Sequence, residues 1–373
     1  MSLKPEVRVH RRIAEVGRDA WDACAGNPAY AGNPFIRFDF LDAVEAAGCA
    51  VEKTGWGPQH LSVEDADGRV AAVMPLYLKS HSQGEYIFDH AWAEAYERAG
   101  GRYYPKLLSA APFTPATGAR LLARADVDPG EARAHLLGGA LAVCEKFGVS
   151  SLHVNFPTEA EWRWMGRQGL ALREGQQYHW LNRGYRDFDD FLAALSSGRR
   201  KTIRRERRDA QAGLEIACLT GDDLTGEHWD AFFGFYMDTG SRKWGRPYLN
   251  RRFFALLHER MADRVLLVMA RRGGRWIAGA LNLIGDDCLY GRNWGCVEDV
   301  PFLHFELCYY QAIEWAIARG YLPTAVYSAH HIADPGLRAP VEQYLERERA
   351  GIEAEMEWLA EEYSPFRQEG PAV

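Results

Sequence analysis

Hydrophobic and polar positions in this chain alternate over short runs and recur at helical spacing over longer ones. Residues 61–78 are predicted to form a strand, an Asp-Gly turn and a second strand, and residues 266–283 repeat this pattern around a Gly-Gly turn. An amphipathic helix is predicted before each hairpin, over residues 35–47 and 251–262. The same order of elements therefore occurs twice in the chain.

A third strand is expected after each hairpin, at residues 86–95 and 288–297. Aligning these two runs places Trp92 on Trp294. A single hairpin match could arise by chance, but three elements in the same order favour a duplicated domain.

The first copy continues with elements that the second copy shortens. Helix, strand, helix and strand are predicted in turn over residues 131–148, 150–156, 158–169 and 171–182. In the second copy a long helix, 302–320, is followed almost at once by the last strand, within 321–332. The second copy is therefore expected to lack a strand and a helix, or the sequence to leave out a segment.

Composition supports two globular domains in a reducing compartment. The 373 residues exceed one ordinary core, and the predicted domains are 1–177 and 178–373, of α/β (α+β) class. The cysteine count is odd, at seven, and contains no C-x-x-C pair, which argues against a disulfide framework and a zinc site. Since no apolar run is long enough to span a bilayer, we expect a cytoplasmic protein.

One dense basic block stands out in a chain of net charge -7: GRRKTIRRERR, within a predicted helix over 198–210. Three interpretations stay open. The block contacts phosphate or RNA, pairs with the acidic helix predicted over 340–362, or is a solvated face. The side chains proposed to contact phosphate or RNA are Lys201, Arg204, Arg205 and Arg208.

Three stretches carry a family resemblance: residues 178–210, which include the basic block, 238–249 (DTGSRKWGRPYL) and 289–320 (LYGRNWGCVEDVPFLHFELCYYQAIEWAIARG). They resemble the FemAB-like predicted N-acyltransferases of the GNAT superfamily, the peptidoglycan biosynthesis/recognition type. The resemblance implies tandem GNAT-like domains of the Fem type.

It also implies transfer of an acyl or aminoacyl group from a thioester or an aminoacyl-tRNA to an amine, by direct attack. The co-substrate would then be acyl-CoA or aminoacyl-tRNA, with no permanently bound cofactor and no metal. The acceptor would be a small molecule or peptide bearing an amine, and tRNA would be a further partner. The alternative is a catalytically inactive recognition module that binds a cell-wall precursor or a partner protein.

Two residues are candidates for taking the acceptor's proton. Glu306 is predicted to lie on an apolar helix face, where burial would raise the pKa of its carboxyl group towards that of a general base. The competing interpretation is a buried carboxylate paired with an arginine such as Arg292. His330, near the last strand, is expected to face the cleft of the second copy.

Substrate binding is predicted at one strand and one loop of the second copy. Alternation along the strand would place Tyr290, Arg292 and Trp294 on one face, where an arginine between two aromatic rings suits an anion or a stacked ring. A loop rich in aromatic and cationic side chains is the second candidate, because such loops often bind ligands. Its residues are Lys243, Trp244, Arg246 and Tyr248.

Overall fold

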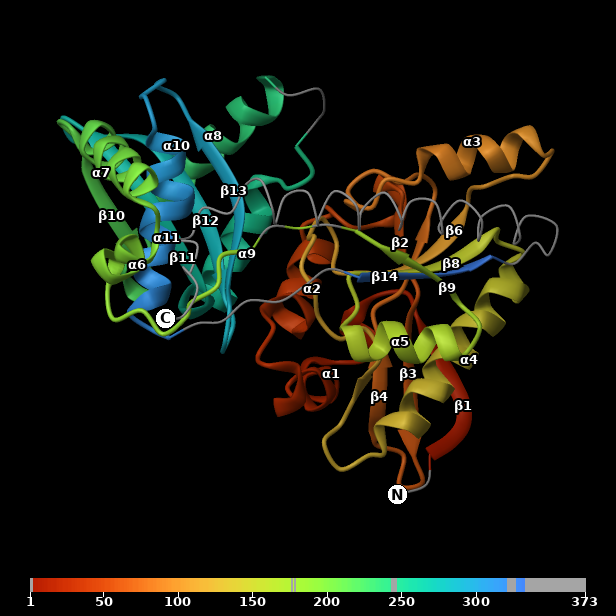
Figure 1. Ribbon diagram of the computed structural model, residues 1–373. Coiled ribbons are helices and arrows are strands. Elements are labelled where there is room, and N and C mark those ends of the chain that lie inside the picture. Colours follow the sequence, from red (N-terminus) through yellow and green to blue (C-terminus); the bar gives the residue numbers. More distant parts are fainter. Residues whose placement is uncertain (1–2, 176, 178, 243–246, 321–326, 333–373) are drawn as a thin grey trace, which may run out of the picture. The chain divides into compact units, whose positions relative to one another are not determined.

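The computed structural model describes residues 3–175, 177, 179–242, 247–320 and 327–332 (Figure 1). The chain divides into two compact units. The N-terminal unit comprises the described residues up to Gln177 together with the strand Tyr327–Ile332, and the C-terminal unit comprises those from 179 to 320.

Two sheets form the N-terminal unit. The smaller is antiparallel, in the order β1-β3-β4-β7, with strands Leu3–His10, His60–Asp65, Val70–Met74 and Leu122–Ala123. The larger has the order β2-β5-β6-β8-β14-β9, with strands Trp56–Pro58, Tyr77–Lys79, Lys106–Ser109, Ser151–Asn155, Tyr327–Ile332 and Ala171–Glu174. Strands β6 and β8 run parallel, and the chain between them contains helix α4, Pro129–Phe147.

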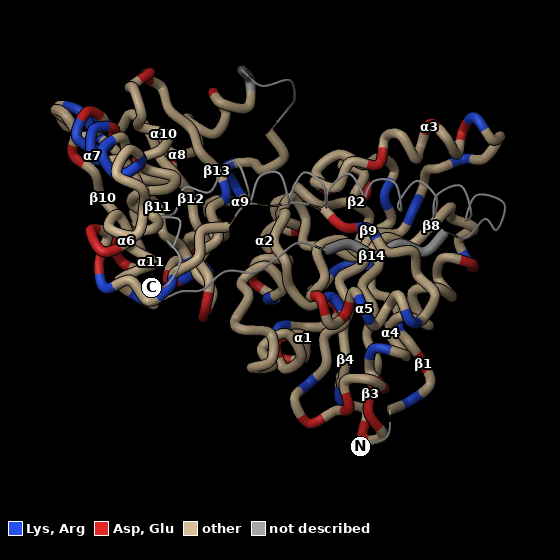
Figure 2. Tube along the Cα trace, viewed as in Figure 1, with Lys and Arg blue, Asp and Glu red and all other residues tan. Residues whose placement is uncertain are grey.

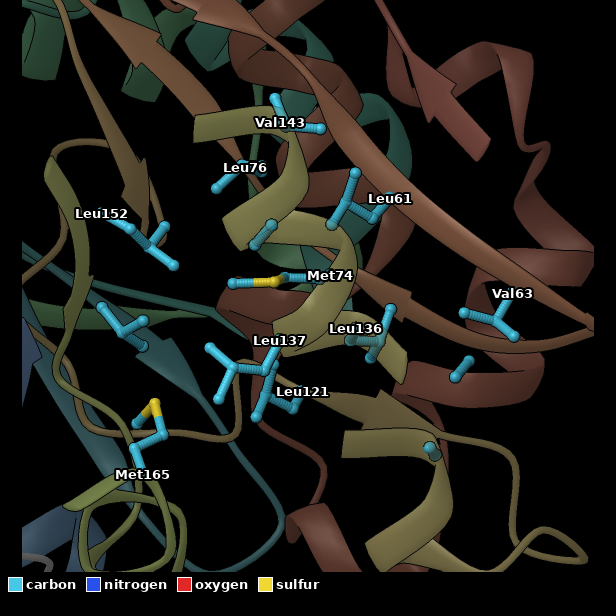
Figure 3. Packing of buried hydrophobic residues seen from close by; sticks show 14 of the residues in the cluster. Leu61, Val63, Met74, Leu76, Leu121, Leu136, Leu137, Val143, Leu152 and Met165 are labelled. Atoms are coloured by element: carbon cyan, nitrogen blue, oxygen red, sulfur yellow. The ribbon is translucent and has the colours of Figure 1, made fainter. Parts of the chain in front are cut away.

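Helix α4 covers an apolar sheet face and closes the main core of this unit. Its residues Leu136, Leu137 and Val143 pack with side chains of β3, β4 and β8 (Figure 3). The other helices are α1, α2, α3 and α5, spanning Arg18–Ala25, Phe38–Ala46, His90–Arg98 and Glu159–Arg167. Thr158 caps α5 through a hydrogen bond that its Oγ1 accepts from the Glu161 backbone N–H, as its sequence predicts.

The C-terminal unit is built on one antiparallel sheet in the order β10-β11-β12-β13. Its strands are Glu215–Leu219, Val265–Arg272, Arg275–Ile284 and Leu289–Cys296. Gly273 and Gly274 both have positive φ in the β11–β12 turn, as the predicted Gly-Gly hairpin requires. Helices α6, α7, α8 and α9 span Phe188–Ala194, Ser197–Gln211, Gly226–Arg242 and Arg251–Met261.

The predicted long helix of this unit contains a π-helical turn. It consists of α10 (Leu303–Phe305), the π-helical segment η7 (Glu306–Tyr310) and α11 (Gln311–Ile317). Leu303 and Leu307 pack against Val268 and Ala280 on one face of the sheet. Helix α8 covers the other face, where Phe232 approaches Gly279.

The predicted hairpins, the α/β class and the helices predicted within the described residues are confirmed, but two predictions about strands are wrong. Residues 86–95 do not form a third strand: α3 begins at His90, since Trp92, Ala93 and Tyr96 have helical spacing and pack with Tyr103. The last strand, β14, belongs to the N-terminal unit rather than to a domain spanning 178–373, because it pairs with both β8 and β9. The acidic helix predicted over 340–362 lies outside the described residues.

Candidate functional site

Strand β13 contains a β-bulge between the two aromatic residues that were predicted to bind substrate, Tyr290 and Trp294. Leu281 pairs with Asn293 and Asn282 with Gly291, so Arg292 is the extra residue. Tyr290 then lies opposite Leu283, and Trp294 opposite Ala280. Positions three apart on a strand face opposite sides of the sheet. The prediction that Tyr290 and Trp294 share one face is therefore wrong, because the bulge shifts the alternation.

Trp294 lies on the sheet face that carries Val268 and Ala280, where its ring meets His304 edge-on at a centroid distance of 5.2 Å. Tyr290 lies on the face covered by α8. Of the predicted loop, Lys243, Trp244 and Arg246 lie outside the described residues, and Tyr248 is exposed.

Glu306 is buried in the π-helical segment, but its carboxylate does not lie among apolar groups. It accepts hydrogen bonds from Arg207 Nε at 3.2 Å and Nη2 at 3.1 Å, from Gln211 Nε2 at 2.8 Å, and from Gln311 Nε2 at 2.7 Å. Arg207 also donates to Glu314 at 2.7 Å. The interpretation of a carboxylate paired with an arginine is therefore the one that the contacts support, and the partner is Arg207 rather than Arg292.

This pair orients the basic helix α7. Arg207 points inward, and Glu206 accepts a hydrogen bond from the Tyr310 hydroxyl at 2.6 Å. Figure 2 shows Lys and Arg positions, in blue, along α7. All four predicted phosphate contacts are exposed: Lys201, Arg204, Arg205 and Arg208.

Within the described residues, two of the exposed cations form ion pairs with exposed acidic side chains. Arg204 pairs with Asp189 at 3.0 Å, and Arg208 pairs with its neighbour Asp209 at 2.9 Å. The acidic segment predicted to oppose them, 340–362, is not among the described residues. Within the part of the chain that the structure describes, the outer face of α7 thus presents several cations and no buried carboxylate to match them.

His330 lies in β14, in the sheet of the N-terminal unit. Its Cα partners are His153 on β8 and Ala171 on β9. The two predicted catalytic residues, Glu306 and His330, therefore belong to different units, which the sequence pattern did not indicate.

The N-terminal unit contains a cleft of about 750 Å³ that sequence reasoning missed. Strand β2, η4 (Glu52–Thr54), α2 and the end of α4 contribute to its walls. Most of the lining is apolar, including Leu78, Phe147 and Val149. The charged side chains in the lining are Arg11, Arg12, Asp42, Glu45 and Glu52.

Among the three carboxylate residues in the lining, Glu45 is the buried one, with 5% of its side chain exposed. Its Oε1 lies 2.6 Å from His60 Nε2, and its Oε2 accepts the backbone N–H of Ile13 at 2.9 Å. His60 Nδ1 accepts the backbone N–H of Leu76 at 3.2 Å, so the ring proton is assigned to Nε2 and is donated to Glu45. The cleft wall thus holds a carboxylate in a fixed orientation.

A second buried polar cluster lies on the larger sheet of this unit. Lys106 Nζ donates to Glu85 at 2.8 Å and also pairs with Asp89, which accepts the Tyr103 hydroxyl at 2.6 Å. Lys79 Nζ lies 3.7 Å from the Trp56 ring centroid and 3.8 Å from Glu85. Burial, only partly offset by Glu85, lowers the pKa of Lys79 to about 7. The sequence signal for this cluster is a lysine within each of the apolar runs LYLKS and PKLLS.

A family model described as peptidoglycan biosynthesis/recognition, FemAB-like, matches residues 12–368. This chain belongs to the FemAB-like family. Its membership and its two α/β units agree with the tandem GNAT-like fold class predicted from the sequence. No curated protein matches the chain significantly.

Solved structures similar to this FemAB-like chain are related to it only at low sequence identity. One is FemX, at 13% identity, 90% coverage of this chain, 100% of that chain and a TM-score of 0.49. Another is the tandem GNAT protein from the clavulanic acid biosynthesis pathway, at 11% identity, with 90% of this chain and 99% of that chain covered and a TM-score of 0.45. A third is the C-terminal domain of a putative lysylphosphatidylglycerol synthetase from Agrobacterium fabrum, at 10% identity, with 88% of this chain and 84% of that chain covered and a TM-score of 0.47.

Within the described part of the FemAB-like chain, no group of three or more His, Cys, Asp or Glu side chains could hold a metal ion. No described helix is both long enough and apolar enough to cross a bilayer.

Proposed function

We propose that this FemAB-like protein is an N-acyltransferase that moves an acyl or aminoacyl group from a thioester or an aminoacyl-tRNA to an amine. The observation that carries the proposal is the match to the family across residues 12–368, in a chain whose N-terminal unit has a cleft with an oriented carboxylate. Direct transfer requires an acceptor amine that loses a proton and a donor held beside it, and no covalent enzyme intermediate.

A polyanionic donor suits the outer face of α7. Lys201, Arg204, Arg205 and Arg208 are exposed there, while Arg207 ties the inner face to Glu306. Phosphate groups of an aminoacyl-tRNA would meet several cations on one rigid helix, which would make binding strongly dependent on salt. Of the two donor classes, the helix therefore favours aminoacyl-tRNA over acyl-CoA.

The other residues predicted from the sequence are each proposed to have one role. Arg292, at the bulge of β13, is proposed to hold an anionic part of the substrate, and Tyr248 to contact the substrate from an exposed position. The same substrate-binding role is proposed for Lys243, Trp244, Arg246, Tyr290 and Trp294. His330 and Glu306 keep their proposed role as proton acceptors. The test of this role is whether their variants lose turnover without losing stability.

The test is a transfer assay with separate donor panels. The purified protein is incubated with a mixture of amines and either acyl-CoA thioesters or tRNA charged with isotopically labelled amino acids. Mass spectrometry then detects amide products. Product from charged tRNA alone supports the aminoacyl route, and product from acyl-CoA alone supports the thioester route. No product from either panel would contradict the proposed activity.

A second candidate function is recognition without transfer, which the family description includes. A recognition module would bind a cell-wall precursor or a partner protein in the cleft and would yield no amide product. Tight binding of muramyl peptides, measured by titration calorimetry in a sample that is inactive with both donor panels, would support this alternative.

A further inference from the structure

We propose that Glu45 accepts the proton of the acceptor amine and that His60 is the residue that positions it. This proposal rests on the acyltransferase function proposed above and places the acceptor amine in the cleft of the N-terminal unit. It differs from the sequence-based candidates, Glu306 and His330. The geometry of Glu45, His60 and the cavity that Glu45 lines carries it.

Glu45 combines burial with access to the cleft. It lines the cavity, yet only 5% of its side chain is exposed. Each carboxylate oxygen accepts one hydrogen bond, from His60 and from the Ile13 backbone. A carboxylate oxygen has two acceptor sites, so one further site on each oxygen is left to receive a proton.

His60 is itself fixed from several sides. Its side chain is fully buried, its Nδ1 accepts the Leu76 N–H, and its ring lies edge-on to Trp21 and Tyr77 at centroid distances of 5.6 and 5.1 Å. The ring can therefore neither rotate nor change tautomer without breaking a backbone hydrogen bond. Its Nε2–H donates to the Glu45 carboxylate and holds it in one rotamer.

Glu306 offers a contrast, since its two oxygens receive four hydrogen bonds at 3.2 Å or less. Those donors leave little capacity for an incoming amine. They come from α7 and α11, so the carboxylate joins structural elements. Glu45 receives half as many bonds and borders a cavity.

Several charged or titratable groups surround this carboxylate. His60 contacts it from β3, and Tyr77 lies near it on β5. Four other charged residues line the same cleft: Asp42, Glu52, Arg11 and Arg12. Burial, followed by the negative charge of Glu45, raises the pKa of Tyr77 well above its usual value. Tyr77 therefore stays protonated in the pH range in which a carboxylate base would titrate.

In the proposed step, the amine nitrogen attacks the acyl carbonyl carbon of the thioester or aminoacyl ester. Its proton passes to a Glu45 oxygen, and the bond from the carbonyl carbon to the thiol sulfur or ribose oxygen breaks. Glu45 returns this proton, directly or through water, to the leaving group, so that the products are the amide and the free thiol or hydroxyl and Glu45 is again a carboxylate. Loss of a general base typically lowers a rate by about 10²–10⁴-fold.

The first experiment measures kcat, KM and the pH profile of kcat in three variants. Glu45→Gln should lower kcat by about 10²-fold or more. His60→Phe should lower kcat and leave KM nearly unchanged, because the carboxylate stays in the cleft wall but loses the donor that orients it. A merely structural role of His60 would lower the yield of folded protein and leave the kcat of the folded fraction unchanged. Glu159→Gln, which breaks a surface ion pair with Arg163 on α5, should change none of these properties.

Wild-type turnover in Glu45→Gln, with an unchanged pH profile and a normal thermal midpoint, would overturn the assignment and leave the acyltransferase function standing. If the wild-type protein transfers nothing, binding of n-hexylamine decides the assignment. Titration calorimetry should then show at least tenfold weaker binding by folded Glu45→Gln than by wild type, and equal binding would overturn the assignment.

Discussion

Arg207 on the basic helix and Glu306 in the π-helical segment form a buried ion pair, with Nη2 and Oε1 3.1 Å apart. The Glu306 side chain is fully buried, and 16% of the Arg207 side chain is exposed. The guanidinium group also lies over the Phe188 ring, with its central carbon 4.3 Å from the ring centroid. One arginine thus joins α7 to α6 and η7, while Lys201, Arg204, Arg205 and Arg208 are exposed.

Replacing Arg207 with Met is expected to lower the free energy of unfolding by about 3 kcal/mol, since it leaves a buried carboxylate without its cation. The double variant Arg207→Met with Glu306→Met should lose less than the sum of the single changes. Denaturant unfolding measures both. Arg204→Met, which breaks an exposed pair with Asp189, is the matched control and should stay within roughly 0.5 kcal/mol of wild type.

A separate variant, Glu306→Gln, tests Glu306 as a proton acceptor. If Glu306→Gln keeps wild-type stability and loses turnover, the carboxylate acts in the chemistry. A loss of stability with the kcat of the remaining folded protein unchanged would show that it acts through packing alone.

Removing the outer cations of α7 is expected to weaken binding to charged tRNA without affecting the fold. For the triple change Lys201, Arg205 and Arg208 to Gln, the slope of log affinity against log salt should fall by about 0.7–0.9 for each phosphate that the helix no longer neutralises. Filter binding across a salt series gives this slope. Arg251→Gln, an exposed arginine paired with Asp230 on α8, should leave it unchanged. An unaltered slope in the triple variant would rule out this face as the phosphate-binding surface.

Lys79 is expected to make stability rise with pH between about 7 and 10. Its folded-state pKa is lowered to about 7, so in this range the unfolded chain keeps a proton that the folded chain has released. Stability then rises with pH, by up to about 1.4 kcal/mol per pH unit from this group. Below pH 7 the lysine is protonated in both states and contributes no slope.

Denaturant unfolding at pH 7.5 and 9.5 checks this sign. The stability of wild type relative to Lys79→Met should be greater at the higher pH. Lys53→Met, which replaces an exposed lysine on η4, should show no such difference. A constant gap between wild type and Lys79→Met at the two pH values would contradict the prediction.

Two glycines on β13 should respond differently to alanine. A Cβ built at Gly295 overlaps the backbone carbonyl of Phe235 on α8, so Gly295→Ala should destabilise the C-terminal unit by roughly 1–3 kcal/mol. At Gly291 the nearest atom to a built Cβ is Asn282 Oδ1 at 3.5 Å, which is an ordinary contact, and Gly291→Ala should be tolerated. Thermal unfolding of both variants tests how closely α8 packs on this strand.

Several local elements of this protein follow from its sequence alone. Helical spacing predicted α2, α4, α7 and α9, Thr158 predicted a cap, and the Gly-Gly pair predicted the β11–β12 turn, because each depends on residues close together in the chain. The quoted motifs also led to the family whose model matches residues 12–368.

Which distant groups meet depends instead on the tertiary structure. A one-residue bulge placed Tyr290 and Trp294 on opposite faces of a sheet, and strand pairing moved His330 into the N-terminal unit. The partners Arg207 with Glu306 and His60 with Glu45 lie apart in sequence and are joined by hydrogen bonds between packed elements. Periodicity specifies which face of an element is buried, whereas pairing and packing between elements specify what that face contacts.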